Sequence, residues 1–257
     1  MDRLKEQRVL ITRAAEDCAA WASRLAAAGA VPLMLPCIEC HPICDQDTVA
    51  RLAEALPNTD WLVLTSRRGS EALHRLIASV EWSPAQRQAM TAIRIAAVGP
   101  ATAASATSLP GEIELVAPSG TARSLAEALA ARLRDRTTSI AGHTRPGCLI
   151  AVAENAGNIL QETLQHAGGD CLRLNVYRTT PAAAATRKQA LSELGADKIL
   201  LASPSAVMGL VNRLELDTAA EILTIGPSTT RAARTAGLTV TAEAARPSLE
   251  GLMEAMQ

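Results

Sequence analysis

Aromatic residues are scarce in this 257-residue chain, which contains no Phe, one Tyr and three Trp. Ala, Leu, Val and Ile must therefore fill its interior, which suits helices that pack closely on sheets through small side chains. So few aromatic rings also offer few surfaces on which nucleic-acid bases could stack. We expect an aliphatic core and no site for single-stranded nucleic acid.

An excess of charge and a long apolar run are missing as well. The formal net charge is −1, so we expect no electrostatic attraction to nucleic acid or to an anionic membrane. No apolar run approaches the length of a membrane span. The first residues, Met1 to Gln7, are charged and polar with no signal-peptide core behind them. These absences predict a soluble, cytoplasmic protein.

Common catalytic and nucleotide-binding motifs are also absent. The chain has no Gly-x-Gly-x-x-Gly, no phosphate loop, no His-Glu-x-x-His and no Gly-x-Ser-x-Gly. None of the four His residues has a partner at ligand spacing; they are His41, His74, His143 and His166. A nucleotide, a metal or a serine nucleophile is therefore unsupported, and an enzyme of this sequence would act by shaping a bound substrate.

One cysteine cluster needs separate treatment, because residues 37–44 read Cys-Ile-Glu-Cys-His-Pro-Ile-Cys. The Cys-x-x-Cys-His pattern matches covalent haem attachment and resembles half of a zinc or iron–sulfur site. Haem attachment normally follows export, however, and no second Cys/His pair completes a zinc site. Because Pro32, Pro36 and Pro42 exclude a helix, the other interpretation is an extended strand with free thiols, and we expect no metal.

Apolar runs typical of buried strands alternate along the chain with segments whose apolar residues recur at helical spacing. The run from Arg8 to Thr12 predicts a strand, and Trp21, Leu25 and Ala28 follow at helical spacing until Gly29 ends the helix. Further strands of this kind are expected at 31–35, 60–66, 94–99, 147–152 and 197–203. A strand followed each time by a helix predicts an α/β fold with parallel sheets flanked by helices.

The same order of segments occurs twice. Asp60–Ser66 corresponds to Asp197–Ser203, and Val98–Ala103 corresponds to Ile225–Thr230. Ser124 and Ser248 occupy matching places as expected starts of a final helix. Matched segments in one order predict two similar halves, and we expect the ligand site in the cleft between them.

Hydroxyl groups and arginines gather where the predicted strands end. In parallel sheets, ligands collect beyond the carboxyl ends of the strands, and the N–H groups at a helix start favour anions. The segments concerned are Thr12–Arg13, Thr65–Arg67, Gly99–Thr102, Ser203–Ser205 and Gly226–Thr229. Each Ser or Thr could serve only as the cap of its own helix. Their repetition in both halves favours binding of a ligand with several carboxylates.

Six segments, in the order in which they occur along the chain, resemble the uroporphyrinogen-III synthase family. They are Val9–Arg13, Asp60–Ser66, Ala97–Ala103, Val176–Thr179, Ala202–Val207 and Ile225–Thr229, and together they span nearly the whole chain. The resemblance implies two similar α/β domains, each a parallel sheet flanked by helices, joined by a two-stranded linker. One domain would combine 1–36 with 180–257, the other would be 43–171, and the linker strands would be 37–42 and 172–179.

The family resemblance also implies a reaction. The enzyme would cyclise hydroxymethylbilane in tetrapyrrole biosynthesis, with loss of water, attack through a spiro intermediate and inversion of the terminal pyrrole ring. It would be a hydro-lyase without a cofactor. We expect a monomer that binds neither nucleic acid nor membrane, with at most transient contact with the preceding and following enzymes of the pathway.

Roles for individual residues follow from the resemblance alone. Tyr177, the only tyrosine, matches a linker tyrosine that helps the hydroxyl to leave, although a phenol could also simply pack there. The expected substrate-binding residues are Arg13, Thr65, Ser66, Arg67, Thr102, Ser203, Ser205 and Thr229. The family often has a proline directly after the first Thr-Arg pair, whereas this chain has Ala14. The resemblance therefore does not extend to the first loop, on which the expected role of Arg13 depends.

Two other interpretations remain open at this stage. A two-domain binding protein or regulator could close on a small anionic ligand without converting it. A homologue of the synthase that has lost its activity would have much the same sequence, because the reaction needs no unique catalytic motif.

Overall fold

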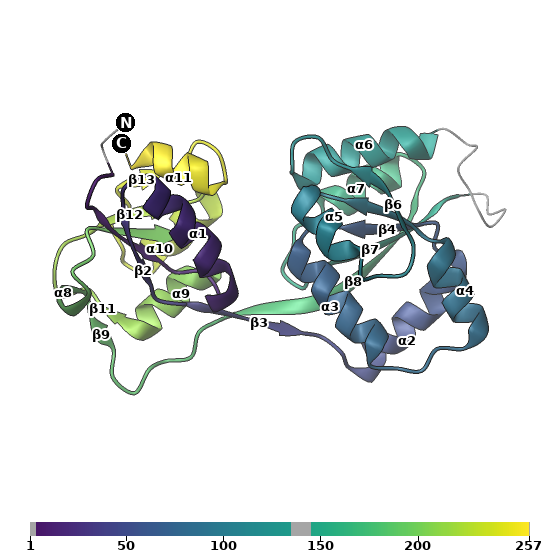
Figure 1. The fold of residues 1–257 in the computed structure, drawn as a ribbon, viewed down its shortest axis with the longest axis horizontal. Coiled ribbons are helices and arrows are strands. Elements are labelled where there is room, and N and C mark those ends of the chain that lie inside the picture. The colour runs from purple at the N-terminus through teal and green to yellow at the C-terminus, as the bar shows by residue number, and fades with distance from the viewer. Residues whose placement is uncertain (1–3, 135–144, 257) are drawn as a thin grey trace. The chain divides into compact units, whose positions relative to one another are not determined.

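The computed structural model describes residues 4–134 and 145–256 and divides into two compact units. Unit 1 combines Met1–Cys40 with Thr179–Gln257, and unit 2 is His41–Arg178. Both units contain a sheet flanked by helices, so the α/β fold class predicted from the alternating pattern is confirmed (Figure 1). None of the described helices is long and apolar enough to cross a membrane.

Unit 1 is built on a five-stranded parallel sheet in the order β13-β12-β10-β1-β2. Its strands are β1 (Arg8–Ile11), β2 (Val31–Met34), β10 (Lys198–Leu201), β12 (Glu221–Thr224) and β13 (Ala242–Glu243). The first strand lies inside the sheet, between β2 and β10, although β10 comes late in the chain. Unit 1 therefore needs both of its segments to complete one sheet.

Helices cover both faces of this sheet. They are α1 (Ala15–Ala27), α8 (Leu191–Leu194), α9 (Pro204–Arg213), α10 (Pro227–Thr235) and α11 (Leu249–Ala255), and a small second sheet pairs β9 (Gln189–Ala190) with β11 (Leu214–Glu215). Leu10 and Ile199 pack with α9 on one face. Val9 and Ile11 pack with α1 and α11 on the other. Alternate residues of a buried strand thus serve two apolar cores.

Unit 2 contains most of a six-stranded sheet in the order β3-β8-β7-β4-β5-β6. The strands are β3 (Ile38–Pro42), β4 (Trp61–Leu64), β5 (Arg94–Ala97), β6 (Glu112–Val116), β7 (Gly147–Ala153) and β8 (Asp170–Pro181). From β8 to β6, each neighbouring pair is parallel. The chain passes between the units within β3 and within β8, and β3 confirms the extended strand expected around the cysteine cluster.

Two layers of helices flank the sheet of unit 2. The helices are α2 (Gln46–Ala55), the short 3-10 helix η1 (Leu56–Asn58), α3 (Arg67–Ala78), α4 (Pro84–Ala92), α5 (Pro100–Ala106), α6 (Ala122–Arg134) and α7 (Ile159–His166). Leu64 and Leu149 face a core shared with α2 and α3. Trp61 and Ile150 face the core under α6 and α7.

The start of α6 differs from the sequence-based prediction, which placed it at Ser124. The helix begins at Ala122, and the Thr121 hydroxyl accepts a hydrogen bond from the Ser124 backbone N–H at 3.1 Å. Thr121 therefore caps the helix three residues before the serine. The matching prediction at Ser248 is confirmed, since its hydroxyl accepts from Gly251 N–H at 3.1 Å and caps α11.

Candidate active site

The predicted strand-end segments lie on neighbouring strands within each sheet. In unit 1 they follow β12, β10 and β1, which are adjacent. In unit 2 they follow β4 and β5, which are also adjacent. Because parallel strands point the same way, these segments share one edge of their sheet. Each unit thus brings its own predicted residues together.

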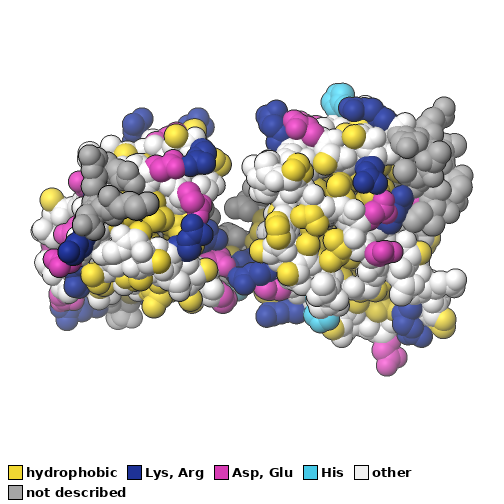
Figure 2. Space-filling model, turned by 45° about the horizontal axis from the view of Figure 1, so that its top comes forward, with side chains coloured by type: hydrophobic (Ala, Val, Ile, Leu, Met, Phe, Trp, Pro, Cys, Tyr) yellow, Lys and Arg dark blue, Asp and Glu magenta, His cyan; other side chains and the backbone are white. Residues whose placement is uncertain are grey.

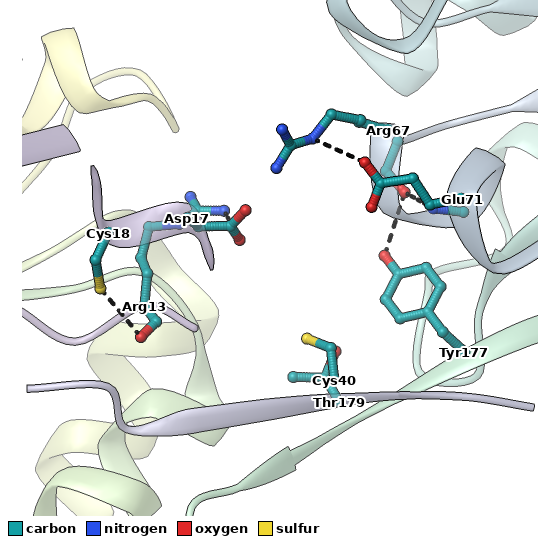
Figure 3. A network of polar contacts seen from close by, with 10 residues as sticks. Arg13, Asp17, Cys18, Cys40, Arg67, Glu71, Tyr177 and Thr179 are labelled. Atoms are coloured by element: carbon teal, nitrogen blue, oxygen red, sulfur yellow. Dashed lines mark hydrogen bonds and ion pairs between the residues drawn. The ribbon is translucent and has the colours of Figure 1, made fainter. Parts of the chain in front are cut away.

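Ser66 starts α3 and links that helix to Tyr177. Its hydroxyl accepts a hydrogen bond from Gly69 N–H at 2.9 Å, so it is the helix cap. The same oxygen lies 3.3 Å from the Tyr177 phenol oxygen. Figure 3 shows the Tyr177 phenol pointing toward the start of the helix that carries Arg67 and Glu71. Next to it, the exposed Arg67 guanidinium lies 3.6 Å from the Glu71 carboxylate. The phenol is therefore held at the positive end of a helix.

A β-bulge determines which face of the sheet Tyr177 occupies. The β7–β8 register pairs Val152 with Asn175 but Ala153 with Tyr177, so Val176 is an extra residue. In a regular strand Tyr177 would lie on the face opposite Leu174. The bulge instead brings it to the core that Leu174 shares with α3. Strand periodicity contains no signal for this change of face.

The residues beside Tyr177 are also held. Arg178 forms a bidentate ion pair with Glu154, with Nε–Oε2 and Nη2–Oε1 distances of 2.6 Å and 2.7 Å. These hydrogen bonds from Arg178 hold the pKa of the Glu154 carboxyl below its usual range. The Glu154 backbone N–H donates to the Tyr177 carbonyl at 2.9 Å. Sequence patterns missed both residues, because their contact depends on the pairing of β7 with β8.

Thr102 and Thr229 occupy equivalent positions in the two units. Each follows a Gly-Pro pair in the first turn of its helix, and each backbone N–H donates to that glycine's carbonyl at 3.1 Å. The side chains are 4% and 1% exposed. Such burial also suits a purely structural residue at a helix start. Their role in ligand binding therefore stays a prediction.

In unit 1, Arg13 lies just beyond β1. Its Nη2 is 2.9 Å from the Asp17 carboxylate, as drawn in Figure 3, and its guanidinium lies 4.8 Å above the centre of the Trp21 ring. The Nε atom is buried without a hydrogen-bond partner among the described residues. Arg13 thus combines a neutralised side with one free N–H donor.

The two predicted serines of unit 1 lie at the start of α9. Ser203 is its cap, because the hydroxyl accepts from Ala206 N–H at 3.1 Å. Ser205 is half-buried in the first turn. The arrangement of Ser203 matches that of Ser66 on α3, as the internal repeat predicts.

Thr65 borders a small cavity within unit 2. The cavity has a volume of about 130 Å³, and its wall includes Ile150, Val152, Leu160 and Arg173. It lies beyond β4 and beside β7. The lining is mostly apolar, so this part of the site would suit a ring better than a carboxylate.

The cysteine cluster is spread over different environments. Cys37 is buried, and desolvation raises the pKa of its thiol to about 12. Cys40 lies 3.6 Å from the Thr179 hydroxyl, and Cys44 is exposed. Among residues 4–134 and 145–256, no three or more His, Cys, Asp or Glu side chains are grouped to hold a metal. His143 lies outside the described residues.

Solved structures of two bacterial enzymes resemble this fold. A mutant uroporphyrinogen III synthase from Thermus thermophilus is 18% identical with a TM-score of 0.53, and the match covers 96% of both chains. The uroporphyrinogen-III synthetase of Helicobacter pylori is 16% identical with a TM-score of 0.58, covering 96% of this chain and 97% of the other. At these identities the likeness concerns the fold.

Sequence comparison identifies the family. A uroporphyrinogen-III synthase from Synechococcus elongatus is 31% identical over 121 residues, which are 46% of this chain and 44% of the relative. That match thus spans less than half the length of the curated relative. The family model described as uroporphyrinogen-III synthase HemD matches residues 19–254. Since this range takes in nearly all of both units, the chain belongs to the uroporphyrinogen-III synthase family.

Proposed function

We propose that this chain is a uroporphyrinogen-III synthase, which converts hydroxymethylbilane into the macrocycle with inversion of the terminal pyrrole ring and loss of one water. The family match supports the reaction. The observation that carries the chemistry is the placement of the only tyrosine, Tyr177, with its phenol 3.3 Å from the Ser66 hydroxyl at the start of α3.

The proposed role of Tyr177 is to help the substrate hydroxyl to leave. As the C–O bond of the hydroxymethyl group breaks, the oxygen takes up the phenol proton and departs as water. The cationic azafulvene left behind is attacked by the substituted carbon of the terminal pyrrole, which gives the spiro intermediate. The original bond between that carbon and its methylene bridge then breaks, which leaves a second azafulvene on the neighbouring ring. The unsubstituted α-carbon of the inverted ring attacks this azafulvene to close the macrocycle, and the proton lost there restores the phenol.

Ser66 and α3 support this step. The Ser66 oxygen lies within hydrogen-bond distance of the phenol and limits where it can point. The positive end of α3 stabilises the negative charge that develops on the phenolate while its proton is away. Positioning of the flexible substrate supplies much of the remaining barrier reduction.

We assign substrate binding to Arg13, Thr65, Ser66, Arg67, Thr102, Ser203, Ser205 and Thr229, with Ser66, Arg67, Ser203 and Ser205 contacting the carboxylates. Asp17 and Glu71 already neutralise much of the charge of Arg13 and Arg67. Hydroxyl groups and helix-start N–H groups would therefore provide most of the binding. Affinity for the carboxylates should accordingly depend only moderately on salt.

The proposed setting is the cytoplasm, with the chain acting as a monomer and without a cofactor. Figure 2 shows acidic and basic side chains intermixed over the visible face of each unit, in keeping with the formal net charge of −1. Such a surface does not favour binding to nucleic acid. Contact with the enzymes that make the substrate and use the product would be transient.

The test is the isomer formed from freshly generated hydroxymethylbilane. The purified chain is incubated with this substrate, and the oxidised uroporphyrin isomers are separated and quantified against a protein-free control. The proposal expects isomer III in excess, at a rate proportional to enzyme concentration. Isomer I alone, formed at the protein-free rate, would overturn it and favour a binding protein or a homologue without activity.

A further inference from the structure

Arg173 directs both terminal nitrogens of its guanidinium group at one turn of unit 2. It lies on β8, four residues before Tyr177, and the turn is residues 153–158, between β7 and α7. Nη2 donates to the carbonyls of Ala153, Glu154 and Ala156 at 2.9, 3.1 and 2.9 Å, and Nη1 approaches the Gly157 carbonyl and Asn158 Oδ1 at 3.4 and 3.2 Å. One side chain thus binds several backbone oxygens of this turn, and that of Ala153 also accepts from Ala156 N–H at 3.0 Å.

Arg173 is itself held in place. Its Nε donates to Asn175 Oδ1 at 3.0 Å, and its carbonyl accepts from Arg51 Nη2 at 2.9 Å. The side chain and the backbone of this residue are therefore fixed from two sides. A planar guanidinium can satisfy several carbonyls at once, whereas a lysine ammonium offers a single nitrogen.

Residues 153–158 also hold the backbone around Tyr177. Glu154 is bound by Arg173 through its carbonyl, donates its N–H to the Tyr177 carbonyl at 2.9 Å and pairs its carboxylate with Arg178. These contacts occur where the bulge at Val176 has interrupted the regular ladder between β7 and β8. On the β7 side, the turn therefore supplies the contact to the Tyr177 backbone at the bulge.

We infer that Arg173 is a positioning residue, which sets the orientation of Tyr177 through its hydrogen bonds to the 153–158 turn. Its importance for turnover rests on the proposed function, but its effect on the phenol does not. Arg173 would not touch the leaving hydroxyl. Its contribution is to keep the phenol at the Ser66 end of α3, which is where the proposed function places it.

The experiment compares Arg173→Lys with the wild type in two measurements. Because Tyr177 is the only tyrosine, fluorotyrosine labelling gives a single fluorine resonance that reports on this ring. We expect Arg173→Lys to shift or broaden that resonance, and to lower kcat by about tenfold to hundredfold with KM changed little. The matched control is Arg213→Lys, which alters a guanidinium bound to the Pro36 carbonyl in unit 1 and should leave the resonance and kcat unchanged.

The two measurements separate the possible failures. An unchanged fluorine resonance in folded Arg173→Lys protein would overturn the inference. A changed resonance with unchanged turnover would support it and instead count against Tyr177 in the proposed reaction. If Arg173→Lys does not fold, Asn175→Ala is used instead, since it removes the acceptor of Arg173 Nε and leaves Arg173 itself in place. A resonance identical to wild type in Asn175→Ala would then overturn the inference.

Discussion

At the scale of the residue, Tyr177 combines three properties. It is the only phenol of the chain, it follows a bulge, and it faces the first turn of a helix. Strand position alone would allow it to be a packing residue, and its ring does contact the core below α3. Removal of the hydroxyl without loss of the ring distinguishes packing from chemistry.

Tyr177→Phe should lower kcat at least about 100-fold, as expected for loss of a positioned general acid, while product affinity changes little. The ring and its packing are kept, so thermal stability should stay near that of the wild type. Steady-state kinetics by the isomer assay and product titration measure the two effects. Turnover equal to wild type would remove Tyr177 from the mechanism.

The buried threonines require a different comparison. Thr102→Ala and Thr229→Ala should each weaken ligand binding by on the order of 1 kcal/mol if the hydroxyl bonds to the substrate. Titration with product and thermal unfolding should be measured on the same samples. A loss confined to thermal stability would assign both residues to their helix starts. Thr107→Ala, on the exposed end of α5, is a matched control.

At the scale of the element, close approach of two backbones limits which residue can stand at the point of contact. The clearest case is α9, which lies directly against the start of the strand that leaves unit 1. A Cβ atom added at Gly209 would lie 1.7 Å from the Cys37 carbonyl oxygen and 3.1 Å from the Ala182 nitrogen. Only glycine permits this approach.

Gly209→Ala should therefore destabilise the fold by about 1–3 kcal/mol or more, because the neighbour that must move is backbone. Chemical denaturation followed by circular dichroism gives the free energy of unfolding. Gly157→Ala is the control, since a Cβ there meets nothing within 4 Å. Equal stability of the two variants would contradict this account of α9.

Local signals explain which elements were predictable. The end of α1 at Gly29, whose φ is +89°, and the α11 cap at Ser248 depend on neighbours in the chain and were predicted correctly. The bulge at Val176 and the Arg173 contacts depend on the pairing of β7 with β8. No periodicity reports such pairings. The candidate Tyr177 was therefore identified by resemblance, and its face by the structure.

At the scale of the whole molecule, the order of strands makes unit 1 depend on distant segments. The Arg8 backbone N–H donates to the Asp197 carboxylate at 2.8 Å, across 189 positions of sequence. By contrast, unit 2 is one continuous stretch, His41–Arg178. The two units should therefore respond differently to truncation.

A chain ending after residue 181 should retain a folded unit 2, while the segment before Cys40 loses its structure. Its strands β1 and β2 would have lost β10, β12 and β13, and a two-stranded remnant is too small to be stable. Hydrogen exchange should show protected amides in β4, β5 and β7, and rapid exchange in β1. Protection of β1 in the truncated chain would contradict the prediction.

The amino-acid sequence by itself determined the α/β class, the repeated strand-to-helix units and the Ser248 cap, because apolar periodicity and capping chemistry act within a few residues. Family motifs in that sequence pointed to the reaction. Only the tertiary structure decided that Tyr177 lies beside Ser66 and that Arg173 holds the turn next to it. These contacts join residues 15 to 111 positions apart, and side-chain packing across paired strands selects them.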